Sequence, residues 1–165
     1  MYAELSQLLE DEKYAIEESL FNQFIRMHES HYAKAGVRPL RERCERLVGQ
    51  LQEAACRAPS RFAKYIRQVA EERISSGYHL KEIQSALTFF EQTIWRICAK
   101  EVEDRQKLLR CLTEASWVIG GAKDELALVY LEHAERTKAS PTTLRCQLQE
   151  LFKGTETAAN AQELS

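Results

Sequence analysis

The stretch Leu80–Val102, LKEIQSALTFFEQTIWRICAKEV, carries the most regular helical pattern in the sequence. Its apolar residues recur at alternating spacings of three and four, and they are Leu80, Ile83, Leu87, Phe90, Ile94 and Ile97. This spacing places the apolar side chains on one face of a helix with 3.6 residues per turn. The stretch therefore predicts an amphipathic helix with one face in a core.

The following segment, residues 105–138, continues the pattern over a greater length. Steps of four and three connect the positions Leu108, Leu112, Ala115, Ile119, Ala122, Leu126, Val129 and His133. This heptad-like seam predicts one long helix, and it makes Leu112, Ile119 and Leu126 candidate interface residues. The pair Gly120-Gly121 falls inside the seam, which leaves three alternatives: close approach of another helix, a kink, or a break between two shorter helices.

Three earlier segments also have helical periodicity. Residues 4–34 predict a helix with a break near Glu10–Glu12, and residues 39–56 predict a second helix. Residues 60–76 predict a third, with Ser60 as its N-cap and Gly77 as the residue that ends it. These helices and the two above form one predicted domain over residues 1–138.

The C-terminal region predicts a separate element. Residues 139–153 carry a capping serine, a proline at the first helical position and an apolar stripe, which predict an amphipathic tail helix. The stripe would pack on the domain, pair with its twin in a dimer, or dock on another protein, so Leu148, Leu151 and Phe152 join the interface candidates. Residues 154–165 are small and polar and are expected to be disordered.

The composition favours an all-α fold. Among 165 residues there are only 6 glycines and 3 prolines. This is about half the usual share of ~12%, and no segment shows the alternating pattern of a strand. Five or six main helices with short connections are therefore expected.

Composition also excludes several classes of function. The net charge of −2 gives no general attraction to nucleic acid. The longest apolar run, Ala127–Leu131, is far shorter than the ~20 residues of a membrane span. The N-terminus has no signal-peptide pattern, and the five cysteines form no CxxC motif, so a reducing cytoplasm is expected.

Two stretches resemble a known family. They are Val69–Leu87, VAEERISSGYHLKEIQSAL, and Leu8–Ile16, LLEDEKYAI. Both resemble the N-terminal sensory domain of the RsbR/RsbRD stressosome co-antagonists, in which a helix ends at glycine and an aromatic residue, and the next begins with a capping residue, leucine and acidic positions. The resemblance covers roughly residues 4–135.

The resemblance implies a globin-like helical domain that lacks haem, forms dimers, performs no catalysis and acts in the bacterial stress response. Such domains pass a signal through a C-terminal helix to an output domain. One departure is His79, where the family favours Ser or Thr, although Glu82 keeps the partner position of a capping box. The other is that no phosphorylatable output domain follows in this sequence, so a stand-alone module acting on a partner protein is expected.

Three histidines are the candidate ligand-binding residues. His28 and His31 form an HxxH pattern on a predicted helix, and His133 ends the long seam. They could be edge-of-core residues, ligands of a metal, or the lining of a small-ligand pocket. A haem ligated by His133 or His79 is a further alternative, which the resemblance argues against. We expect no cofactor and no metal.

The remaining patterns give no catalytic motif. Residues 36–79 carry nine Lys and Arg against five Asp and Glu, which favours a solvated face over a phosphate or acidic-partner site. Cys44, Cys98 and Cys111 lie beside apolar positions and are expected to be buried, inert thiols. The sequence therefore favours a non-enzymatic cytoplasmic regulatory or sensory module, with a metal- or haem-binding redox protein and an adaptor of a larger complex as alternatives.

Overall fold

A computed structural model of the chain describes residues 2–27 and 30–137. The chain separates into two units, Met1–Ala127 and Leu128–Ser165, and the boundary falls inside the last helix. The predicted tail helix at 139–153 and the segment 154–165 lie outside the described residues, as do Leu148, Leu151 and Phe152. Of the second unit, only residues 128–137 are therefore described below.

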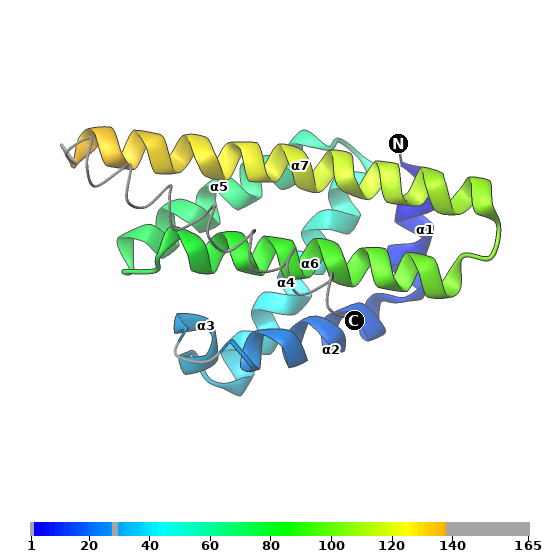
Figure 1. Cartoon of the computed structure of the whole chain (residues 1–165), viewed down its shortest axis with the longest axis horizontal. Helices are drawn as coiled ribbons and strands as arrows, with labels where there is room; N and C mark the ends of the chain where they lie inside the picture. The colour runs from blue at the N-terminus through cyan, green and yellow to red at the C-terminus, as the bar shows by residue number, and fades with distance from the viewer. Residues whose placement is uncertain (1, 28–29, 138–165) are drawn as a thin grey trace, which may run out of the picture. The chain divides into compact units, whose positions relative to one another are not determined.

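The described residues form helices and no strands, which confirms the all-α fold class (Figure 1). Seven helices fall within these residues: α1 (Ala3–Asp11), α2 (Lys13–Ile25), α3 (His31–Lys34), α4 (Val37–Cys56), α5 (Ser60–Ser75), α6 (Leu80–Glu101) and α7 (Arg105–Arg136). The long C-terminal helix predicted from the heptad-like seam is α7.

The predicted helix over residues 4–34 is divided at two places. The break near Glu12 is confirmed, since α1 ends at Asp11 and α2 begins at Lys13. A second break follows Ile25 and was not predicted. Ser30 is the signal for it: its Oγ accepts a hydrogen bond from the Ala33 N–H at 3.2 Å and donates to the Met27 carbonyl at 2.6 Å. An N-cap serine of this kind starts α3 as a new helix.

At the junction between α5 and α6, the prediction that Gly77 ends the helix is confirmed. Gly77 has φ +85°, its N–H donates to the Ile74 carbonyl at 3.1 Å, and the Tyr78 N–H donates to the Arg73 carbonyl at 2.9 Å. These two bonds form a Schellman motif, which requires a left-handed residue and so favours glycine. The prediction of Ser60 as N-cap of α5 was wrong, because Pro59 holds that position and Ser60 is the first helical residue.

Helix α7 runs through Gly120-Gly121 without a break. A Cβ atom added at either glycine would meet no other atom of residues 2–27 and 30–137 within 4 Å outside the local backbone. Of the three alternatives, the helix break is therefore wrong, and no other helix among the described residues approaches the glycine pair closely. Each glycine has a lower helix propensity than alanine and therefore lowers the stability of α7.

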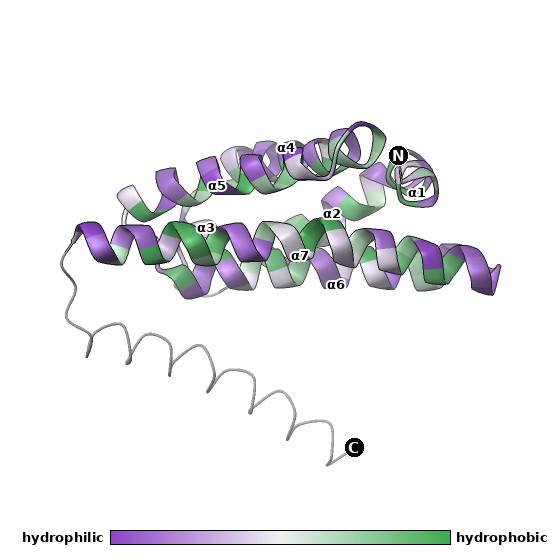
Figure 2. Cartoon of the chain, turned by 90° about the horizontal axis from the view of Figure 1, so that it is seen from above, coloured by the Kyte–Doolittle hydropathy of each residue, from purple (hydrophilic) through white to green (hydrophobic). Residues whose placement is uncertain are grey.

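The core of the first unit lies where the apolar faces of the helices meet. Helix α2 packs against α4 and α6, α4 packs against α1 and α5, and α5 packs against α6. Figure 2 shows hydrophilic and hydrophobic residues alternating along the helices, as amphipathic helices require. The largest fully buried side chains include Leu5, Leu9, Ile16, Leu20, Leu40, Leu51, Phe62, Phe90, Ile94 and Ile119.

Candidate functional site

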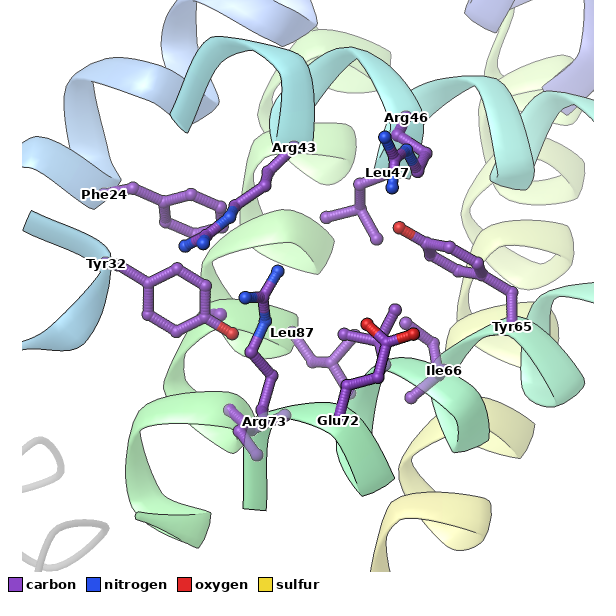
Figure 3. A pocket seen from close by; sticks show the side chains of 13 residues that line it. Phe24, Tyr32, Arg43, Arg46, Leu47, Tyr65, Ile66, Glu72, Arg73 and Leu87 are labelled. Carbon is purple, nitrogen blue, oxygen red and sulfur yellow. The ribbon is translucent and has the colours of Figure 1, made fainter. Parts of the chain in front are cut away.

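A pocket of about 60 Å³ opens within the first unit, between α4, α5 and α6 (Figure 3). Phe24 of α2 and Tyr32 of α3 close one side of it. Its lining residues are Phe24, Tyr32, Arg43, Arg46, Leu47, Tyr65, Ile66, Val69, Glu72, Arg73, Ile83, Ala86 and Leu87. The apolar members belong to the faces that the helical periodicity directs inward, so the pocket is a gap in the core packing rather than an unrelated surface feature.

Three guanidinium groups border these apolar walls. Arg43 and Arg46 are three residues apart on α4, which places both on one face of the helix, and Arg73 lies near the end of α5. Within residues 2–27 and 30–137, none of the three forms an ion pair with a carboxylate. Glu72 is the single acidic residue in the lining. The pocket therefore carries an excess of positive charge.

Tyr78 holds two of the arginines in place. Arg43 donates a hydrogen bond from Nη1 to the Tyr78 hydroxyl at 2.9 Å, and the Arg73 guanidinium lies 5.1 Å from the centre of the Tyr78 ring. The Nε atom of Arg73 is buried and has no hydrogen-bond partner in the described part of the chain. A buried N–H without an acceptor is costly, and an acceptor entering the pocket would remove that cost.

Two tyrosines add further donors to the lining. Burial raises the pKa of Tyr32 well above its ordinary value, and burial also raises the pKa of Tyr65. Both hydroxyls therefore stay protonated at neutral pH and can donate hydrogen bonds. Tyr32 packs against the rings of Phe24 and Tyr78, each with a centroid distance of 5.3 Å. Its side chain is fixed by these contacts.

Glu82 ties the start of α6 to α3 beside the pocket. Its carboxylate accepts from the backbone N–H of His31 at 2.7 Å, from that of His79 at 2.9 Å, and lies 3.0 Å from His31 Nδ1. Burial acts to raise the pKa of Glu82, but the hydrogen bonds from His31 and His79 outweigh it and lower the pKa overall. The expected partnership of Glu82 with the His79 backbone is confirmed.

Of the three candidate histidines, the structure describes His31, in the first unit, and His133, in the second. His31 is half-buried and paired with Glu82, His133 is exposed in the last turn of α7 in the second unit, and His28 lies outside the described residues. Among the residues that the structure describes, no three His, Cys, Asp or Glu side chains gather as metal ligands would. The helices found there are also too short or too polar to cross a membrane.

The interface candidates on α7 divide into two kinds. Ile119 is fully buried and Leu126 is 3% exposed within the single chain, so both side chains are part of its core. Leu112 is half-buried and lines a hollow with Trp95, Ala99, Thr113, Ser116 and Trp117. Trp95 is 42% exposed and Trp117 is 72% exposed. We call this surface the tryptophan hollow.

The cysteines are not all isolated. Cys44 is buried, and burial raises the pKa of its thiol to about 12, which keeps it inert at neutral pH. Cys98 of α6 and Cys111 of α7 are also buried, but their Sγ atoms lie 3.1 Å apart. The hydrogen bond between the two sulfur atoms lowers the pKa of Cys98. The expectation of inert thiols therefore describes Cys44 better than this pair.

The pocket arginines were missed in the sequence, although a signal was present. Residues 36–79 carry an excess of four positive charges, and Arg43, Arg46 and Arg73 lie within them. Arg57 and Arg61 belong to the same charge excess, but they pair with Glu53. Comparison with protein-family models, curated protein sequences and solved structures finds no match to this chain. The argument for function therefore rests on the geometry.

Proposed function

We propose that the chain is a non-catalytic regulatory module of bacterial signalling, in which a small ligand binds between α4, α5 and α6 and alters the packing of α7. The observation that carries this proposal is the pocket itself, with three arginines that have no carboxylate partner among the described residues and a buried Arg73 Nε without an acceptor. Concave apolar sites with a few convergent polar groups are the usual places for small ligands.

The position of α7 supports a route for the signal. Arg67 of α5 donates to Glu125 of α7 at 2.8 Å, and Lys123 of α7 donates to Glu91 of α6 at 2.5 Å. Lys123 and Glu125, two residues apart on α7, thus contact α6 and α5, which both contribute residues to the pocket lining. A ligand that changes the spacing of α5 and α6 must strain or shift these contacts, which is the helix-shift type of transition.

The proposed route can be tested with a substitution that fills the pocket with a larger side chain in place of a ligand. Ala86 is 6% exposed and lines the pocket, so Ala86→Leu adds apolar volume where a ligand would sit. Hydrogen exchange of the backbone should then change in α5, in α6 and around Lys123–Glu125 of α7. Ala15→Leu, at an exposed position of α2, is the matched control. Changes confined to the turns next to Ala86 would contradict the proposed route.

The proposal includes a homodimer, in the cytoplasm, that acts on a partner regulatory protein. The tryptophan hollow supports the dimer, because exposed tryptophans beside an apolar residue are typical of the centre of a protein interface. Sedimentation of the wild type and of Trp117→Ser tests it. A dimer that Trp117→Ser converts to monomer supports this surface, and an unchanged sedimentation coefficient contradicts it.

A further inference from the structure

The size of the pocket limits its ligand. A volume of about 60 Å³ provides space for roughly four to six water-sized groups, at about 10–15 Å³ for each. The enclosed space is too small to take up a whole nucleotide or a whole long acyl chain. The ligand is therefore a molecule of roughly four to six non-hydrogen atoms.

The charge of the pocket selects an anion. Arg43, Arg46 and Arg73 face one acidic residue, Glu72, and none of the three is neutralised by an ion pair within the described residues. The planar guanidinium group offers parallel N–H donors that match the two oxygens of a carboxylate. The buried Nε of Arg73 is one such donor that still needs an acceptor.

The apolar walls select against a purely polar anion. In Figure 3 the guanidinium groups of Arg43 and Arg73 and the Tyr32 hydroxyl lie on one side of the pocket. Leu87 lies beside them, and Leu47, Ile66 and the Glu72 carboxylate lie farther across. Inorganic phosphate would satisfy the arginines and leave these apolar side chains uncovered. A carboxylate with a short hydrocarbon chain would satisfy both parts of the pocket.

We infer that the pocket binds a short-chain monocarboxylate of roughly three or four carbons, with its carboxylate between Arg43 and Arg73 and its chain against Leu47, Ile66 and Leu87. This inference rests on the proposed function, since it names the ligand of the same pocket. It assigns Arg73 as the main anion-binding residue because its Nε is the buried donor without a partner in the described part of the chain.

The test is calorimetric titration of the full chain with sodium butyrate at constant ionic strength. Three matched probes separate the contributions: 1-butanol keeps the chain without the charge, sodium phosphate keeps charge without the chain, and sodium octanoate keeps the carboxylate with a chain too long for the pocket. Butyrate should bind at millimolar concentration or tighter, and at least tenfold more tightly than any of the three. Equal or tighter binding of phosphate, 1-butanol or octanoate would overturn the ligand class.

The location is tested with two variants. Arg73→Gln should weaken butyrate binding at least tenfold, whereas Arg57→Gln, which removes an exposed arginine outside the pocket, should leave binding unchanged. Arg46→Gln serves if Arg73→Gln does not fold, because Arg46 is exposed at the rim and its loss should weaken binding severalfold. Equal affinity in all variants would overturn the assignment to this pocket.

Failure of this inference can be told apart from failure of the proposed function. If Ala86→Leu changes hydrogen exchange in α7 but butyrate does not bind, the ligand class is wrong and the regulatory route stands. If butyrate binds in the pocket but neither butyrate nor Ala86→Leu affects α7, the ligand class stands and the regulatory route is wrong.

Discussion

The pocket between α5 and α6 and the contacts of the same helices with α7 both use charged side chains, but they use them differently. On the α7 side, Arg67 pairs with Glu125 and Lys123 pairs with Glu91. On the pocket side, Arg43, Arg46 and Arg73 have no carboxylate partner in the described part of the chain. Paired charges hold helices together, whereas three cations around an apolar gap with the single carboxylate of Glu72 repel one another. The comparison supports the proposal that the pocket arginines bind a ligand.

On the α7 side, the largest expected change in the free energy of unfolding comes from a disulfide bond between Cys98 and Cys111. Cys98 and Cys111 are 13 residues apart in sequence and their Sγ atoms lie 3.1 Å apart. Oxidation of the purified protein with diamide should therefore join α6 to α7, and closing a loop of this length should raise the free energy of unfolding by about 3 kcal/mol. Peptide mapping and thermal unfolding measure both effects.

Cys98→Ser is the control, since it removes the cross-link and leaves the exposed Cys56 in place. Cross-links between two chains through Cys56, with none between Cys98 and Cys111, would show that the α6–α7 packing described above is wrong.

On the pocket side, Glu82→Gln should have the next largest effect. The Glu82 carboxylate accepts from two backbone N–H groups and from His31, and its loss should lower the free energy of unfolding by about 1–2 kcal/mol at neutral pH. Because the pKa of folded Glu82 lies below its ordinary value of 4.5, this contribution is present above that value and is lost as the pH falls through the folded pKa.

Urea unfolding of the wild type and of Glu82→Gln over a pH series checks the sign. The difference between the two proteins should be largest at neutral pH and should shrink below pH ~4.5. A difference that grows as the medium becomes more acidic would contradict the assignment of these hydrogen bonds to the ionised carboxylate.

A smaller change in the free energy of unfolding is expected when a paired cation and an unpaired pocket cation are removed in turn. Lys123→Gln leaves Glu91, whose side chain is 13% exposed, without its cation and should lower the free energy of unfolding by about 1 kcal/mol. Arg46→Gln removes a pocket cation and should change stability by less than ~0.5 kcal/mol. Equal losses in urea unfolding would mean that the pocket arginines stabilise the fold, and the comparison above would fail.

The smallest expected effect is a gain of stability in α7. Gly121 is exposed in the middle of the helix, and an added Cβ meets no neighbour within 4 Å. Gly121→Ala should therefore raise the free energy of unfolding by about 0.5–1 kcal/mol. Gly77→Ala is the contrasting variant, since Gly77 has φ +85° and its substitution should destabilise. A loss of stability in Gly121→Ala would indicate a packing role for that glycine that the geometry does not show.

The helices and their inward faces could be predicted from the sequence because periodicity is a local property. The seam on α7 and the apolar face of α6 both appear where the spacing places them, and Gly77 ends α5 as its conformational freedom predicts. The second break before α3 was missed because the apolar spacing continues through it, and only the Ser30 cap marks it.

The site was not predictable in the same way. Arg43 and Arg73 lie on different helices, and the packing of α4 against α5 brings them to one pocket. Nothing in the local sequence separates them from Arg57 and Arg61, which pair with Glu53 on the surface. The stressosome resemblance, with its globin-like and dimeric expectations, remains a prediction.

Thermal unfolding with and without sodium butyrate tests the central claim most directly, because a ligand that binds only the folded state raises the melting temperature. We predict a rise that increases with butyrate concentration in the wild type and in Arg57→Gln, and that is absent in Arg73→Gln. No rise in the wild type, or the same rise in Arg73→Gln, would contradict the account.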